Sequence, residues 1–453
     1  QRIMKNITRN LIITAACMAL PAQLMAKEWT LKACIDYALQ NNITLQKSRL
    51  NQLAAKEDIK ESQAALLPSL SLATSQNVSY NPWPETNSYV VAGNRVETSV
   101  DKAYYNGGYS LSANWTVWNG NRNHNQVKLN KFAEKQADFA VASNINTLTE
   151  QITQLFVQIL YSNEAIKVNQ ESLATSAKNE ERGKEMLAVG KMSKADLAQL
   201  TAQRAQDEYA IVQAESNLKE YKRQLKQLLQ LTNGEAFDVV VPETTDDMAL
   251  ELIPNVSSVY EQALTTRPEI KNAELSIQSS ELNIKLAKSL RMPTIAMSAG
   301  ISTNTSTMNK NGWDKQMKNN FVIGGGFNIS IPLLDNRQAK TAISKAEIQR
   351  QTNMLDLKDK QTALYSTIEN YWLQANNNQS MFKSARISTE SAKESYALLS
   401  EQFRLGLKNI IELMTGKDNL LKAEQNELQS KYLAILNINM LKYYQNGMTV
   451  FLF

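Results

Sequence analysis

Two long stretches of the chain carry hydrophobic residues at helical spacing with almost no helix-breaking residue. In the first, from about 119 to 189, apolar residues recur alternately four and three positions apart. They include Val141, Ile145, Leu148, Ile152, Leu155 and Ile159. This 3.5-residue period is typical of helices that supercoil around partners. A helix of this length would extend about 100 Å, at about 1.5 Å per residue, so it needs partner helices along its whole length.

The second long stretch, from about 335 to 405, has the same length as the first and is entered through a comparable pattern. Residues 115–119 read Trp-Thr-Val-Trp-Asn, and residues 331–335 read Ile-Pro-Leu-Leu-Asp. Two further segments, 38–68 and 263–293, align without a gap and both end in proline. Such ordered self-similarity indicates an internal duplication. The first copy then carries a longer loop between its proline and its long helix.

Four shorter segments change to a period of two, which is typical of β-strands. They lie at about 68–80, 104–118, 294–304 and 321–332. Each has one apolar face and one face of small polar residues, and none contains a charge. Strands of about ten residues with this alternation are typical of membrane β-barrels. Aromatic residues near the strand ends favour the barrel over half-buried strands of a soluble sandwich, the alternative for each segment alone.

These patterns divide the chain into a leader and two structural repeats, 27–255 and 256–453. Gly190 and Gly406 each reverse the chain after a long helix, because glycine readily adopts the left-handed conformation that ends helices. We expect returning helices at about 193–231 and 409–445, and an intermediate loop at 232–255 between the two repeats.

Residues 1–26 have the pattern of a secretory signal peptide. Basic Lys5 and Arg9 precede an apolar run, and the small Ala26 stands at a plausible cleavage point. Cys17 is the alternative, as a lipidation site. After cleavage Cys34 would be the only cysteine, so no disulfide could form within the chain. No later stretch is apolar for long enough to form a spanning helix, which leaves periplasm, secretion or an outer-membrane β-barrel.

The sequence offers no set of residues for catalysis. Its single histidine, His124, stands among asparagines and cannot by itself build a metal site or a Ser-His-Asp arrangement. We therefore expect no enzyme activity, no cofactor and no metal. The formal net charge is +5, and basic residues near the N-terminus supply much of it, so nucleic acid is not an expected partner.

The ordered set of motifs resembles the TolC-like outer-membrane efflux protein family over essentially the whole mature sequence. The motifs are Ala38-Leu39 with Leu66-Leu67-Pro68, Arg267-Pro268-Glu269, residues 331–335 and the two glycine turns. The resemblance implies a mixed α and β membrane protein. Three identical chains would form a 12-stranded β-barrel in outer-membrane lipid, four strands per chain, continued by a long periplasmic α-helical barrel.

In function, the resemblance implies a passive exit duct of a tripartite efflux or secretion system. A periplasmic adaptor (membrane fusion) protein would open its periplasmic tip, and an inner-membrane transporter would supply the energy. A secreted or periplasmic coiled-coil scaffold without channel activity is the alternative, although it would not explain the four charge-free strands. The exported substrate is left open.

The resemblance also places a gate at the periplasmic end. The adaptor-docking tips would be Val189, Gly190, Lys191, Leu405, Gly406 and Leu407, and the gate residues Asp196, Phe403, Lys408, Glu412 and Thr415. In the family, positions matching Asp196 and Lys408 link neighbouring coils, and the acid matching Glu412 forms a ring at the constriction. Two positions depart from the family pattern: Phe403 replaces an aromatic hydroxyl, and Thr415 replaces a second acid. Solvated charges of little energetic effect are the alternative.

Overall fold

The structure is a computed structural model that describes residues 29–446 except 84–86, 92–93, 99–101 and 233–236. The predicted signal peptide, Cys17 included, lies outside these residues. The chain forms two compact units. The first contains the segments up to Ser48, Val141–Ile270 and the chain from Lys360 onwards, and the second contains Arg49–Ala140 and Lys271–Asp359. Each unit therefore combines segments from both halves of the sequence.

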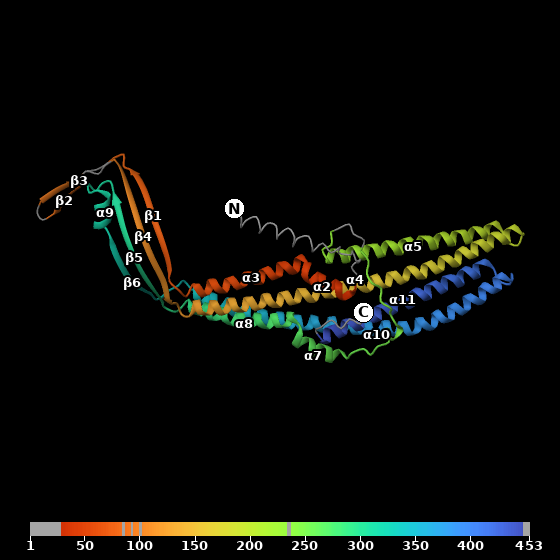
Figure 1. Cartoon of the computed structure of the whole chain (residues 1–453). Helices are drawn as coiled ribbons and strands as arrows, with labels where there is room; N and C mark the ends of the chain where they lie inside the picture. The colour runs from red at the N-terminus through yellow and green to blue at the C-terminus, as the bar shows by residue number, and fades with distance from the viewer. Residues whose placement is uncertain (1–28, 84–86, 92–93, 99–101, 233–236, 447–453) are drawn as a thin grey trace, which may run out of the picture. The chain divides into compact units, whose positions relative to one another are not determined.

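The two halves contain corresponding helices in the same order (Figure 1). The pairs are α2 (Leu31–Asn41) with α7 (Val256–Thr266), α3 (Ile43–Ala64) with α8 (Pro268–Ser289), α4 (Arg122–Ala188) with α10 (Gln338–Arg404), and α5 (Lys194–Leu228) with α11 (Ile410–Asn446). Both long helices have 67 residues, and the returning helices have 35 and 37. This correspondence confirms the internal duplication.

In the second unit, four strands form one antiparallel sheet in the order β1-β4-β5-β6 (Figure 1). The strands are β1 (Ser69–Tyr80), β4 (Ala103–Trp118), β5 (Thr294–Ser306) and β6 (Val322–Ser330). The register sets Leu72 opposite Leu111, Leu111 opposite Ile301, and Ile301 opposite Ile323, so the apolar residues share one face. Leu72 and Ile323 are among the most exposed apolar residues, so the chain itself leaves this face uncovered.

Each long helix begins three residues later than the sequence pattern suggests, at 122 and 338 rather than 119 and 335. Two residues with positive φ stand between strand and helix in each half: Gly120 and Asn121 in the first, Asn336 and Arg337 in the second. A helix cannot pass through left-handed residues, so they delay its start.

The residues expected to start the helices instead cap them. The amide of Asn123 donates to the Asn119 side chain at 3.3 Å, and that of Ala339 donates to Asp335 at 2.8 Å. Asn and Asp favour cap positions because their side-chain oxygens accept from otherwise unpaired backbone amides. The shift in the helix starts therefore has a local cause.

The structure adds short elements where the sequence suggested loops. They are α6 (Asp246–Ala249) in the intermediate loop, β2 (Asn87–Val91) and β3 (Asn94–Thr98) in the first strand connection, and α9 (Trp313–Asn319) in the second. Buried Gln316 holds α9, because its amide donates to the carbonyls of Ser306, Asn309 and Asn311. Elements this short carry too few residues to show a hydrophobic period.

The main hydrophobic core of the first unit surrounds the middle of α4. Buried Ile152, Phe156 and Leu160 belong to one cluster with Cys34 of α2 and Leu225 of α5, and α11 adds Leu428 and Tyr432. Cys34 is fully buried. A smaller cluster joins α6, α10 and α11 through Ala249, Phe382 and Ile435. Segments far apart in sequence are thus held together by apolar packing.

The burial of residues along α10 predicts that two isoleucine-to-alanine substitutions differ sharply in their effect on the free energy of unfolding. Ile368 is fully buried, so Ile368→Ala should lower the free energy of unfolding by about 2–5 kcal/mol, through lost apolar burial and the cavity left behind. Ile387 on the same helix is exposed, and Ile387→Ala is the matched control with a small expected loss. Denaturant unfolding in detergent measures both, and equal losses would contradict this burial pattern.

Candidate functional site at the helical tips

Both glycine turns have the geometry that ends a helix. Gly190 has φ of 71° and Gly406 has φ of 75°. The Lys191 amide donates to Met186 O at 2.8 Å, and the Leu407 amide donates to Gln402 O at 2.9 Å. These bonds, from the residue after the glycine back into the last helical turn, form the Schellman arrangement.

The turns expose apolar side chains. Val189, Leu405 and Leu407 are all exposed, and Lys191 stands exposed beside them. An atom added at the Cβ position of either turn glycine would meet nothing within 4 Å. The predicted docking residues therefore occupy open protrusions, with apolar surface available for contact.

Each returning helix begins at a capping residue that holds one of the predicted gate acids. Ser193 Oγ accepts from the Asp196 amide at 3.1 Å and donates to Asp196 Oδ2 at 2.7 Å. Asn409 Oδ1 accepts from the Glu412 amide at 2.9 Å, and Glu412 Oε2 accepts from the Asn409 amide at 3.2 Å. The reciprocal Asn409–Glu412 pair is a capping box. An acid in the first turn of each helix is also favoured by the positive end of the helix dipole.

Glu412 also forms an ion pair with Lys408, which lies in the turn just before α11. Lys408 Nζ lies 2.5 Å from Glu412 Oε1. Hydrogen bonding from Lys408, followed by that from the Asn409 amide, lowers the pKa of the Glu412 carboxyl. Because the pKa is lowered, any stabilisation is present above the ordinary glutamate pKa and is lost as the pH falls through the lowered value.

Phe403 lies inside an apolar cluster at the tips. It is buried and packs with Leu200 of α5 and with Ile410 and Leu413 of α11. This cluster therefore contains residues from both helical hairpins, α4–α5 and α10–α11. Where the resemblance would place a hydrogen-bonding hydroxyl, this chain has apolar contacts.

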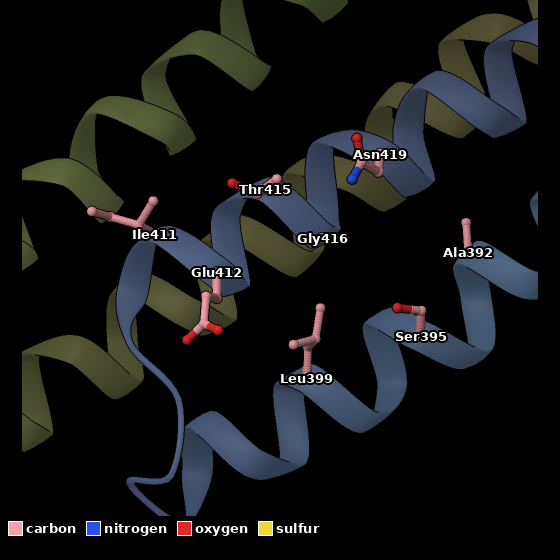
Figure 2. A pocket seen from close by; sticks show the side chains of 8 residues that line it. All are labelled: Ala392, Ser395, Leu399, Ile411, Glu412, Thr415, Gly416 and Asn419. Atoms are coloured by element: carbon pink, nitrogen blue, oxygen red, sulfur yellow. The ribbon is translucent and has the colours of Figure 1, made fainter.

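Thr415 and Glu412 line a groove between α10 and α11, shown in Figure 2. Its volume is about 330 Å3, and its other lining residues are Ala392, Ser395, Leu399, Ile411, Gly416 and Asn419. Leu399 points from α10 toward α11 (Figure 2). A Cβ added at Gly416 would lie 2.6 Å from Leu399 Cδ1, so the glycine leaves room for the Leu399 side chain.

The structure brings some predicted gate residues together and leaves others apart. Lys408, Glu412 and Thr415 lie on successive turns around the start of α11, and Phe403 packs against the same turns. In the part of the chain that the structure describes, the side-chain bonds of Asp196 go to Ser193 and those of Lys408 go to Glu412. Asp196 and Lys408 are thus not linked within one chain.

Sequence reasoning missed a buried polar cluster between the helices near the tips, centred on Asp207 and Lys417. Its signal was present, because these residues continue the three-four spacing of the apolar positions. Buried positions in α5 include Leu200, Gln203 and Asp207, and those in α11 include Ile410, Leu413 and Lys417. Polar residues at core positions of a heptad pattern identify such sites.

The described residues contain no group of three or more His, Cys, Asp or Glu side chains placed to hold a metal ion. Within the same residues, no helix combines the length and the apolar character needed to cross a bilayer.

Paired helical hairpins and a four-stranded sheet, both built by duplication, define the class of outer-membrane efflux channels. The sequence model of the outer membrane efflux protein family matches residues 34–230 and 259–443. The chain belongs to this family, whose members are channels of the outer membrane with a periplasmic helical extension. TolC-like channels are trimers that work with an adaptor and an inner-membrane pump.

Two relatives match most of the length of the chain. The outer membrane protein TolC of Vibrio cholerae is 21% identical, covering 95% of this chain and 93% of its own. The probable outer membrane lipoprotein SilC of Salmonella typhimurium is 22% identical, covering 88% of this chain and 81% of its own.

Solved structures share the fold. The outer membrane protein VceC of Vibrio cholerae has a TM-score of 0.74 at 16% identity, covering 91% of this chain and 95% of its own. The CmeC channel of Campylobacter jejuni has a TM-score of 0.75 at 15% identity, covering 92% of this chain and 86% of its own. These likenesses confirm the predicted fold class.

The ion pair at the tip predicts a measurable pKa change. Lys408→Met should raise the pKa of Glu412 toward its ordinary value, because its largest stabilising partner is removed. Arg404→Met is the matched control, since Arg404 lowers the pKa of Glu401 rather than that of Glu412. Titration of glutamates labelled with 13C measures both values. An unchanged pKa of Glu412 in Lys408→Met would contradict this assignment.

Proposed function

We propose that this chain is the outer-membrane exit duct of a tripartite efflux or secretion system, acting as a passive homotrimer without catalytic activity. The observation that carries the proposal is the four-stranded sheet, whose apolar face is exposed and whose outer strands β1 and β6 are each paired on one side. Lipid can cover the apolar face, but lipid cannot pair the edge strands.

Closure of the sheet requires further copies of the chain. Closed membrane barrels begin at about 8 strands, so four strands are too few. Three copies would supply 12 strands, and β1 of one chain would pair with β6 of the next. Each unpaired backbone group in lipid costs several kcal/mol, so this pairing gives a strong drive to assemble.

The helical tips would receive the adaptor protein. The exposed apolar residues Val189, Leu405 and Leu407 offer contact surface at the turns. A helical hairpin of an adaptor could pack an apolar stripe against these exposed turns.

The gate would lie at the start of α11. Three copies of Glu412 around an axis would form a ring of carboxylates, and rings of acids favour cations. Lys408 would moderate this charge, because it pairs with Glu412 in each chain. The apolar cluster around Phe403 would hold the two hairpins together near the constriction.

Assembly and conduction test the duct. Purified protein should form trimers by light scattering in mild detergent and should conduct ions across a planar bilayer. Leu72→Lys should prevent stable insertion, since a lysine facing lipid costs about 2–4 kcal/mol near the bilayer centre. Ser71→Lys, on the opposite face of β1, is the matched control and should still insert. A soluble monomer without current would favour the coiled-coil scaffold and refute the duct.

Charge changes at the tips test the gate. The double variant Asp196→Ala with Lys408→Ala should raise single-channel conductance, because it removes both side chains that would link neighbouring coils at the gate. Glu412→Ala should lower the preference for cations and weaken block by multivalent cations. Glu401→Ala, which removes an exposed acid of α10 outside the gate, should leave selectivity unchanged. Parent-like conductance and selectivity in both gate variants would show that the constriction lies elsewhere.

A further inference from the structure

The buried face of α4 changes character along the helix. In its middle, the buried residues are mainly apolar, as in Ile152, Phe156 and Leu160. Toward Gly190 the buried residues become polar. They are Asn169, Ser176, Asn179 and Glu180, followed by Gly183. The hairpins are therefore held near their tips by directional polar contacts as well as by apolar packing.

The centre of this polar region is an ion pair between the two hairpins. Lys417 Nζ of α11 lies 2.5 Å from Asp207 Oδ2 of α5, and both side chains are 4% exposed. Ser176 Oγ of α4 donates to the same carboxylate oxygen at 2.5 Å. Three helices therefore meet at one carboxylate.

Gln203 completes the cluster. Its amide donates to Asp207 Oδ1 at 3.4 Å and to Asp418 Oδ1 of α11 at 3.2 Å. A second side-chain contact thus crosses from α5 to α11. The positive charge of Lys417 interacts with the carboxylates of both Asp207 and Asp418. Both acids therefore favour the position that Lys417 occupies.

These polar residues occupy positions that a coiled coil normally fills with apolar side chains. Buried ion pairs contribute little net stability compared with apolar residues of similar size. Their recognised use at core positions is to specify one register and one arrangement of the helices. The pair is therefore better suited to fixing the relative position of α5 and α11 than to stabilising the unit.

The position of the pair connects it to the gate. Lys417 follows Glu412 by little more than one helical turn, and Leu413 between them packs in the tip cluster. If α11 slid or rotated past α5, Lys417 would leave Asp207 as an uncompensated buried charge. Such a movement is strongly opposed, because an unpaired charge is poorly solvated in a buried site.

We propose that Asp207 and Lys417 are positioning residues of the gate, which hold the first turns of α11 against the α4–α5 hairpin and so keep the periplasmic end narrow. This inference rests on the proposed function. The residues would act through the placement of Glu412 and Thr415, without contacting the exported substrate.

Channel currents of variants that lack the ion pair test the proposal. Asp207→Leu and Lys417→Met, made singly, should each raise the open fraction of the channel about tenfold or more, since each leaves a buried charge unpaired in the narrow arrangement. The double variant should recover a parent-like melting temperature, because apolar replacement of both partners is often neutral for stability. It should still conduct more than the parent, since the contact that specifies register is absent.

A matched control variant distinguishes an effect on the position of α11 from a general loss of protein stability. Arg267 is buried to the same extent, lies 2.7 Å from Glu150 in the same unit, and stacks on the Tyr444 ring at 3.9 Å. Arg267→Met should lower the melting temperature and leave the open fraction unchanged.

Three results would overturn the inference. If the double variant forms trimers and conducts as the parent does, the pair does not position the gate, while the parent's current still supports the duct. If Arg267→Met raises the open fraction as much as the Lys417 variant, loss of stability alone explains the effect. A parent protein without current would refute the duct itself, and the inference with it.

Discussion

The length of the two 67-residue helices is the constraint on which the rest of the structure depends. A helix that long cannot cover its own apolar stripe, and short neighbours can cover only part of it. Full apolar burial occurs where α2, α5 and α11 meet the middle of α4, around Phe156 and Leu160. Elsewhere, Ile348 and Leu355 of α10 stay exposed in the single chain. Surface of this kind suits further copies of the chain, as the family's trimers provide.

Much of the fold was predictable because its signals are repeated over many residues. The three-four spacing along α4 and the alternation in β4 each extend over several periods, and Gly190 and Gly406 interrupt a helical pattern at matching places. The helix starts were not predictable to the residue, because the positive φ at Asn121 and Arg337 leaves little trace in sequence. The short helices α6 and α9 were not predicted because elements of 4 and 7 residues are too short to show a hydrophobic period.

The candidate site shows a different limit of sequence reasoning. The tip residues were located by resemblance, but their partners depend on geometry: Lys408 pairs with Glu412 one turn away, and Phe403 packs in an apolar cluster. Asp207 and Lys417 are far apart in sequence. From its sequence context alone, each would be interpreted as an exposed charged residue. Only their place in the heptad pattern distinguishes them, because a charged residue at a core position must find a partner there.

The change from apolar to polar burial along α4 suits a molecule in which one end must move and the other must not. Apolar packing has no preferred direction, so helices held only by leucine and isoleucine can slide between similar arrangements at small cost. An ion pair with a hydrogen-bonded carboxylate has one favourable geometry, and intermediate positions leave its charges unpaired. Near the tips, the Asp207–Lys417 pair therefore favours one defined position of α11 over a continuous range. Around Phe156, where no gate residue lies, the apolar core can supply stability without specifying a switch.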